Sequence, residues 1–359
     1  DVLDANQGII HVISPELGIA QPGLTLVCPD SHTCSQGALG MLAWGIGSTE
    51  AEHAIVTGTL RVKKPQQMRI AINGVLRLGV TAKDIALHII AKYGAAGAKR
   101  CAVEYAGNTI ENMSIEQRLT LCNMAVEFGA FTAVIAPDET TYTYLQGRKF
   151  SPEGTAWHQA LENWQDLKSE SDAQFDYAYE IKASDIKTMV TWGTSPEHAI
   201  PVDSHIPETS DSKALDYMDV AIGDKLSHLK IGGAFIGSCT NARLSDLRVA
   251  AKILDGHKVA EGVKAICVPG SMAVKRDAEG EGLHKIFEAA GFKWGAAGCA
   301  FCFYAGGETF AVGTRVISST NRNFEGRQGP GVRTHLASPA VVAASAIAGK
   351  ITAPKGISS

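Results

Sequence analysis

Three cysteines in two separate segments have the spacing of a metal centre. Cys239 lies in the run Ile236-Gly-Ser-Cys-Thr-Asn241, and Cys299 and Cys302 form a CxxC pair about sixty residues later. Three thiolates cannot close a four-ligand site made of cysteine alone, but they suit a metal centre with one open position. A redox CxxC, a zinc site completed by a histidine, and three unrelated thiols are the alternatives that this spacing leaves open.

Imidazoles and a carboxylate are expected near two adjacent strand ends. Asp30-Ser31-His32 and His11 supply two histidines, an acid and a hydroxyl. A carboxylate next to an imidazole fixes its tautomer and shifts its pKa, as acid–base catalysis near neutral pH requires. The triplet by itself fits a short polar turn capped by Asp30 at least as well.

Two further pairs of residues have spacings that suit substrate binding. Arg322 and Arg327 lie five apart in a glycine-containing loop. Arginine forks bind carboxylates bidentately, so two of them suit a di- or tricarboxylate, although surface ion pairs fit the spacing equally well. Asn123 and Glu127 are four apart on a helix expected over 115–127, which predicts that they share one face.

Positioning these residues requires strands and helices that alternate. The sequence predicts an α/β fold with mainly parallel sheets, in which strands deliver polar residues into glycine-rich turns before helices. We expect a first α/β domain over 1–64, a second over 65–190 with a helical excursion at 151–185, and a third over 191–359 that carries the cysteines. The expected strands are 8–13, 24–28, 68–75, 101–105, 234–236, 265–268 and 315–317, and the expected helices are 50–60, 85–93, 115–127, 244–254 and one after Pro339.

Composition excludes several functional classes. The 359 residues carry 33 basic and 37 acidic side chains, so no basic stripe argues for nucleic acid. No apolar run approaches the roughly twenty residues that span a bilayer. Eight cysteines without dense or regular spacing favour functional thiols in a reducing compartment, the cytoplasm or an organelle matrix. The chain opens at Asp1 in what reads as mid-domain sequence, so we expect an N-terminal portion to be missing.

Ordered motifs along the chain resemble those of the aconitase superfamily, and within it the large subunits of isopropylmalate dehydratases. The resemblance spans residues 8 to 349. The matching segments are DSHT at 30–33, CNMAVEFGA at 122–130, APDETT at 136–141, VTWGT at 190–194, FIGSCTNARLSDLR at 235–248, VPGS at 268–271, GCAFC at 298–302 and STNRNFEGRQG at 319–329.

This resemblance implies an aconitase-like three-layer α/β/α fold and a [4Fe–4S] cluster with a labile fourth iron, held by Cys239, Cys299 and Cys302. It implies the catalytic pairs His11–Asp30 and His32–Glu127. Substrate or cluster contacts would come from Ser31, Asn123, Asn241, Arg322 and Arg327. The implied reaction isomerises 2-isopropylmalate and 3-isopropylmalate by loss and re-addition of water, in leucine biosynthesis. The implied partner is a small subunit that carries the swivelling domain.

Departures from the family pattern keep other functions open. The family's upstream Asp-His motif is absent, and Cys34 and Ala297 stand where other residues are frequent. A related hydro-lyase on homoaconitate, an alkylmalate or a secondary metabolite is therefore an alternative. A cluster-free RNA-binding protein, which the charge balance disfavours, and a non-catalytic assembly subunit are the alternatives from other classes.

Overall fold

The computed structural model describes residues 4–209, 211–305 and 307–354. The chain forms two compact units, one built from 1–9, 77–95 and 186–359, and the other from 10–76 and 96–185. No helix in the described ranges is both long and apolar enough to cross a lipid bilayer. The three-domain division at 64 and 190 stays a prediction, although each of the three segments holds a parallel sheet of its own.

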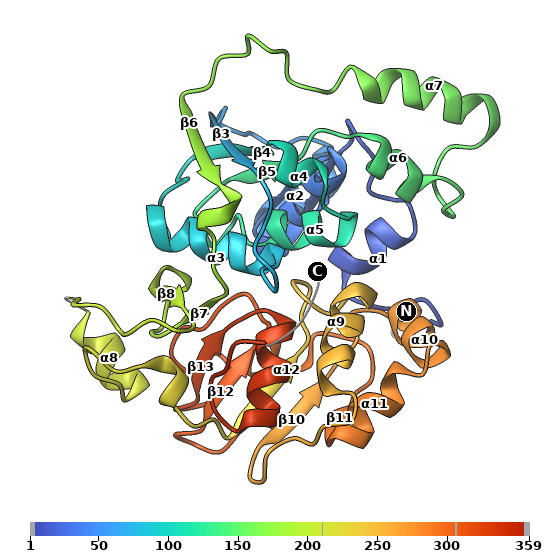
Figure 1. The fold of residues 1–359 in the computed structure, drawn as a ribbon. Helices are drawn as coiled ribbons and strands as arrows, with labels where there is room; N and C mark the ends of the chain where they lie inside the picture. The colour runs from blue at the N-terminus through green and yellow to red at the C-terminus, as the bar shows by residue number, and fades with distance from the viewer. Residues whose placement is uncertain (1–3, 210, 306, 355–359) are drawn as a thin grey trace. The chain divides into compact units, whose positions relative to one another are not determined.

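The first unit is organised around a five-stranded parallel sheet (Figure 1). Its strand order is β11-β10-β9-β12-β13, so the chain starts in the middle, builds outward on one side and then continues on the other. In such a sheet the loops after the two central strands diverge and leave a crevice between them. The strands are β9 (Gly233–Ile236), β10 (Lys264–Cys267), β11 (Phe292–Trp294), β12 (Arg315–Ser318) and β13 (Arg333–Leu336).

Helices and a small hairpin complete this unit. The helices α9 and α12 contact each other, and α12 also contacts β9 and β12. The antiparallel pair of β7 (Met189–Thr191) and β8 (Ala199–Pro201) contacts α3. The helices are α3 (Ala82–Tyr93), α8 (Ser212–Met218), α9 (Leu244–Leu254), α10 (Met272–Gly280), α11 (Leu283–Ala290) and α12 (Pro339–Ala348).

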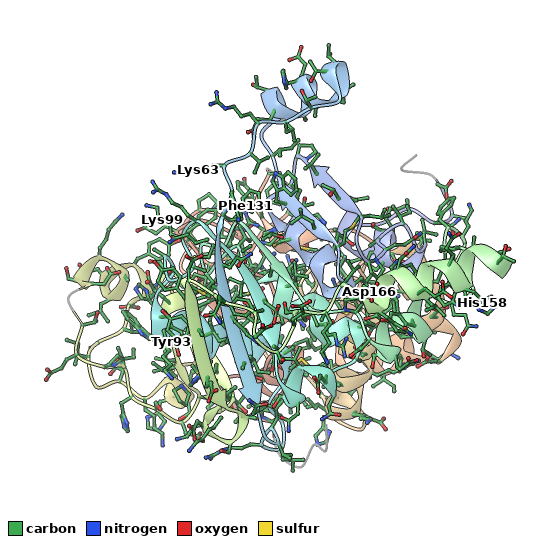
Figure 2. The ribbon with its side chains drawn as sticks, turned by 90° about the horizontal axis from the view of Figure 1, so that it is seen from above. Lys63, Tyr93, Lys99, Phe131, His158 and Asp166 are labelled. Carbon is green, nitrogen blue, oxygen red and sulfur yellow. The ribbon has the colours of Figure 1, made fainter. Side chains whose placement is uncertain are left out.

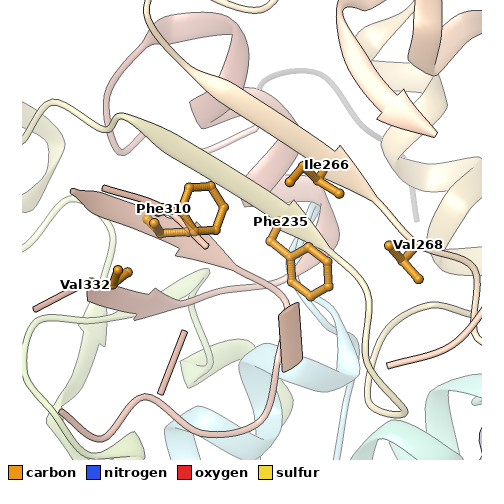
Figure 3. Close-up of a cluster of buried hydrophobic side chains, with 6 residues drawn as sticks. Phe235, Ile266, Val268, Phe310 and Val332 are labelled. Carbon is orange, nitrogen blue, oxygen red and sulfur yellow. The ribbon is translucent and has the colours of Figure 1, made fainter. Parts of the chain in front are cut away.

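A buried apolar cluster lies on the sheet, and it anchors the CxxC segment. Figure 3 shows Phe235 and Ile266 from the neighbouring strands β9 and β10 beside Phe310. Val268, Val316 and Val332 complete the cluster. Phe301, between the two cysteines of the pair, packs against it, with its ring 5.8 Å from that of Phe235 and 5.4 Å from that of Phe310. Apolar burial therefore fixes the position of the thiol-bearing turn.

The second unit holds two parallel sheets. The larger has the order β5-β4-β3-β6, and the smaller pairs β1 with β2. Its helices are α1 (Ile10–Glu16), α2 (Ser48–Thr57), α4 (Asn108–Glu111), α5 (Ile115–Asn123), α6 (Glu139–Leu145) and α7 (Gly154–Gln165). The strands are β1 (Thr25–Cys28), β2 (Leu42–Gly45), β3 (Gln66–Asn73), β4 (Cys101–Ala106), β5 (Thr132–Val134) and β6 (Tyr177–Lys182).

Two helices of this unit are largely solvated. The helix α2 buries none of its side chains, and α7 buries only Trp164 among its described residues. Figure 2 shows His158 on α7 and Asp166 directly after it. The prediction of a helical excursion at 151–185 is therefore partly confirmed by α7. The prediction was wrong for the end of this range, where the strand β6 joins the larger sheet as an edge strand.

The prediction of an α/β fold with mainly parallel sheets is confirmed, since only β7 and β8 pair antiparallel among the named strands. Two further local predictions were wrong. Residues 8–13 were expected as a strand, but Ile10–Glu16 is the helix α1, which ends with Pro15 and Glu16. The helix expected to reach residue 127 ends at Asn123, and turns follow it.

Candidate active site

A carboxylate shared by two histidines lies at the end of β1 in the second unit. Asp30 caps a 3₁₀ helix over Ser31–Leu39, and its Oδ1 accepts a hydrogen bond from the His32 backbone N–H at 2.8 Å. The His11 side chain, buried on α1, donates from Nε2 to the same Oδ1, also at 2.8 Å. The hydrogen bonds from His11 and then from His32 hold the pKa of Asp30 well below its usual range. Asp30 is therefore ionised whenever these contacts are made.

A second imidazole–carboxylate pair lies beside the first. His32 Nε2 donates to Glu127 Oε1 at 2.9 Å, and both side chains are buried. The His32 carbonyl accepts from Ser35 Oγ, and Ser35 Oγ in turn accepts from the Asn123 amide at 2.9 Å. Asn123 and Glu127 thus support the same 3₁₀ helix, although they do not share the helical face that was predicted.

A glycine of β2 makes room for this arrangement. A Cβ atom added to Gly45 would lie 2.6 Å from the Asp30 carbonyl oxygen and 2.8 Å from the Ser31 Cα. Because real Cβ atoms do not approach so closely, only glycine lets β2 pair with β1 in this register. Ser31 itself is exposed, with its Oγ 3.4 Å from His32 Nδ1.

In the first unit, the loops after β9 and β12 bring polar groups to two of the thiols. Cys239 follows β9 after Gly237 and Ser238, and Asn321 lies in the loop after β12. The Asn321 amide donates to Cys239 Sγ at 3.6 Å, and the Ser238 hydroxyl lies 3.3 Å from Cys302 Sγ. Ser238 has a positive φ of 82°, which is strained for a residue with a side chain. Contacts of its hydroxyl with both cysteine segments help to maintain this backbone conformation.

Cys299 is the N-cap of a short 3₁₀ turn, Ala300–Cys302, which ends with the second cysteine of the pair. Cys302 is buried, and Cys299 is partly exposed on the wall of a pocket of about 390 Å³. Cys239 precedes α9 by five residues, and Arg243 is the N-cap of that helix. Side-chain donors, rather than the helix end, therefore lie next to the sulfur of Cys239.

The arginines and Asn241 take different positions around the thiols. Arg327 donates from Nη2 to Cys302 Sγ at 3.5 Å, and its guanidinium lies 5.5 Å from the ring of Phe303 and 5.3 Å from that of Phe324. Arg322 is partly buried in the same loop. Asn241 is buried and donates from Nδ2 to Asp246 on α9 at 2.9 Å.

Comparison with known proteins shows which family this chain belongs to. Residues 1–349 match the aconitase family (aconitate hydratase). The chain belongs to the aconitase family. It is 51% identical over 361 aligned positions to "3-isopropylmalate dehydratase large subunit 1" of Bradyrhizobium diazoefficiens, covering 98% of this chain and 76% of that protein.

A solved aconitase-family structure is a more distant match. The holo-form of aconitase X from Thermococcus kodakaraensis is 14% identical, with a TM-score of 0.41. The match covers 84% of this chain and 63% of that one, so this chain spans less than two thirds of that protein. The resemblance stated from the motifs is confirmed by the family match and by the bacterial relative.

Aconitase-family proteins typically use a [4Fe–4S] cluster, and the donor set here fits one. Among the described residues, no three His, Cys, Asp or Glu side chains converge on a single metal ion. A cluster is wider than one ion and is held by thiolates that approach it from different sides. Cys239 and Cys302 have the same neighbours, Ser238 and Asn321, which can donate hydrogen bonds to bound sulfur.

Sequence reasoning missed three polar residues that contact the predicted ones. Ser238 and Asn321 contact the thiols, and Ser35 links Asn123 to His32. Two of them lie directly beside predicted residues, Ser238 before Cys239 and Asn321 before Arg322. Because Ser238 and Asn321 lie inside the quoted motifs next to predicted residues, that position was the signal that could have identified them.

Proposed function

We propose that this chain is the large subunit of a [4Fe–4S]-dependent hydro-lyase that isomerises 2-isopropylmalate and 3-isopropylmalate in leucine biosynthesis. The observation that carries the proposal is the 51% identity, over 98% of this chain, to a protein named as a 3-isopropylmalate dehydratase large subunit. The two imidazole–carboxylate pairs and the three-thiol set support the same chemistry.

Cys239, Cys299 and Cys302 are proposed to hold the cluster. When bound, the cluster supplies a Lewis acid that makes hydroxide a better leaving group. The donors around the thiols, Ser238 and Asn321, orient the sulfurs and stabilise their negative charge.

The imidazole pairs are proposed to hold and move protons. Dehydration removes a proton from one carbon and hydroxide from its neighbour, and rehydration returns them in exchanged positions. His32, buried against Glu127, can hold a proton and donate it to the leaving hydroxide, which then departs as water. His11 donates to the ionised Asp30, so this contact fixes the orientation of both side chains.

The substrate carboxylates are proposed to bind Arg322 and Arg327. The guanidinium of Arg327 lies close to two aromatic rings, which restricts its rotamers and lowers the entropy lost on binding. Ser31, Asn123 and Asn241 are proposed to support substrate or cluster contacts.

The word "subunit" in the relative's name supports a small-subunit partner. We propose that this partner carries the swivelling domain and completes the side-chain pocket for the substrate. An interaction with nucleic acid or with a membrane is not part of the proposal.

The test reconstitutes this chain anaerobically with iron and sulfide, adds the small subunit, and follows 3-isopropylmalate by chromatography and ultraviolet absorbance. Homoaconitate and an alkylmalate are measured in parallel. Isomerisation of 3-isopropylmalate that disappears in Cys302→Ser, but not in Cys101→Ala, is the expected result. Cys302→Ser with full iron content and activity would contradict the proposal.

A further inference from the structure

A lysine is buried at the start of α3, where an apolar residue would be expected. Lys83 has 0% exposure, and so has its neighbour Asp84. Removing an ammonium from water costs several kcal/mol unless hydrogen bonds compensate. Such a residue is costly for stability and is best explained by what it contacts.

The ammonium of Lys83 is directed at the loop after β12. Its Nζ donates to the Ser319 carbonyl at 3.0 Å and to the Thr320 carbonyl. These two residues immediately precede Asn321 and Arg322. A single side chain thus fixes two consecutive peptide groups at the base of this loop.

Ser319 extends this connection to the cysteine segment after β9. Its Oγ donates to the Gly237 carbonyl at 3.1 Å, and the Gly237 N–H donates back to it at 3.0 Å. The same hydroxyl lies 3.3 Å from the Asn241 carbonyl. Ser319, whose carbonyl accepts from Lys83, is therefore hydrogen-bonded through its hydroxyl to residues on both sides of Cys239.

Asp84 supports the loop from another direction. Its Oδ1 accepts from the Met189 N–H at 2.7 Å at the start of β7. At the end of β7, Thr191 Oγ1 accepts from the Asn323 amide at 3.2 Å. Lys83 thus contacts the start of the segment 319–323 directly, and Asp84 supports the end of this segment through β7.

We infer that Lys83 is a positioning residue for the thiol site: it holds the backbone at 319–320 so that the Asn321 amide faces Cys239 and Cys302. The inference rests on the proposed role of those cysteines. It concerns the polypeptide alone, so its first test needs neither cluster nor substrate.

The test compares Lys83→Met, Lys83→Arg and Lys92→Met in the cluster-free chain. Lys92 is exposed in the last turn of the same helix and controls for loss of a lysine from α3. Alkylation rates of individual cysteines are measured by mass spectrometry, with the buried Cys122 and Cys267 as internal references. Hydrogen–deuterium exchange of peptides covering 318–323 is followed in parallel.

Lys83→Met is expected to raise alkylation of Cys239 and Cys302, and exchange in 318–323, about tenfold, because the loop loses hydrogen bonds from a charged donor. Cys122 and Cys267 should not change, and Lys83→Arg should recover most of the protection. Equal acceleration at all four cysteines, or no change at Cys239 and Cys302, would overturn the inference. If Lys83→Met does not fold, Lys83→Gln is measured in the same way.

The enzymatic readout separates this inference from the proposed function. With the reconstituted complex, Lys83→Met should lower kcat more than it raises KM, since the loop is displaced rather than a substrate ligand removed. If no variant and no wild-type complex isomerises 3-isopropylmalate, the proposed function fails while the thiol data still decide the role of Lys83.

Discussion

The side-chain amide of Asn321 donates to the sulfur of Cys239 across 3.6 Å, although 82 residues separate them in sequence. The two residues follow β12 and β9, the neighbouring strands at which the sheet reverses its winding direction. Because β9 and β12 are parallel and hydrogen-bonded to each other, the loops that follow them begin side by side at the same edge of the sheet. The topology of the sheet therefore brings a hydrogen-bond donor next to a cysteine that is far from it in the sequence.

Removing this donor should weaken retention of a cluster. Asn321→Ala is expected to lose iron about threefold to tenfold faster than the unmodified chain, because one hydrogen bond to sulfur is absent. Iron release to a chelator measures the rate, and Asn112→Ala, an exposed site on the second unit, is the control. An unchanged release rate would show that the Asn321 contact has no role at the cysteine.

Neutralising Glu127 should impair proton transfer without unfolding the chain. Glu127→Gln preserves the shape of the side chain but removes the charge that His32 contacts, so kcat should fall about 100-fold to 10,000-fold. Steady-state kinetics with the reconstituted complex measure this, and Glu52→Gln on the solvated helix α2 is the matched control. A loss confined to KM would assign Glu127 to binding instead.

Arg327→Lys should raise KM for a dicarboxylate about tenfold to 100-fold, because an ammonium cannot form the bidentate contact of a guanidinium. The matched control is Arg61→Lys, on an exposed segment of the second unit. An unchanged KM would leave carboxylate binding to other residues.

The acidity of one buried histidine predicts a pH dependence of stability. His335 donates from Nδ1 to the Thr191 carbonyl at 2.6 Å, and its Nε2 accepts from Arg315 at 2.9 Å. Burial, and then the Arg315 charge, lowers the pKa of His335 to about 3 from its ordinary 6.5. The folded state therefore excludes a proton that the unfolded chain binds.

Stability from His335 is fully present above about pH 6.5 and is lost as the pH falls toward 3. The difference in free energy of unfolding between the protein and His335→Gln should shrink by about 1.4 kcal/mol per pH unit in this range. Urea denaturation at several pH values measures it. A difference that does not vary with pH would mean that His335 is solvated.

How much the sequence determines can be seen at particular residues. The helix 244–254 was predicted with the bounds that the structure gives α9, because its apolar stripe and its start are local signals. The apolar run at 8–13 was misread as a strand, since β-branched residues favour strands locally while α1 is set by its tertiary surroundings. β6 was missed because it is a mostly exposed edge strand with polar residues.

The residues of the candidate site likewise include some that the sequence predicted and some that it could not predict. The pairs His11–Asp30 and His32–Glu127 came from the family resemblance, and the structure contains both contacts. The left-handed backbone of Ser238 had no sequence signal, because residues with side chains rarely adopt it and only the surrounding contacts maintain it. Lys83 was likewise invisible, since its partners are backbone carbonyls far along the chain.

Because Phe301 attaches the CxxC turn to the sheet by apolar contacts, the order of that turn should depend on temperature. Its ring holds the turn between Cys299 and Cys302 through contact with Phe235 and Phe310. Apolar association weakens on cooling, whereas hydrogen bonds such as those to Ser319 do not depend on that effect. Chilled samples should therefore loosen the CxxC turn before the loop that carries Asn321, so that cooling affects Cys302 before Cys239 in the proposed cluster site.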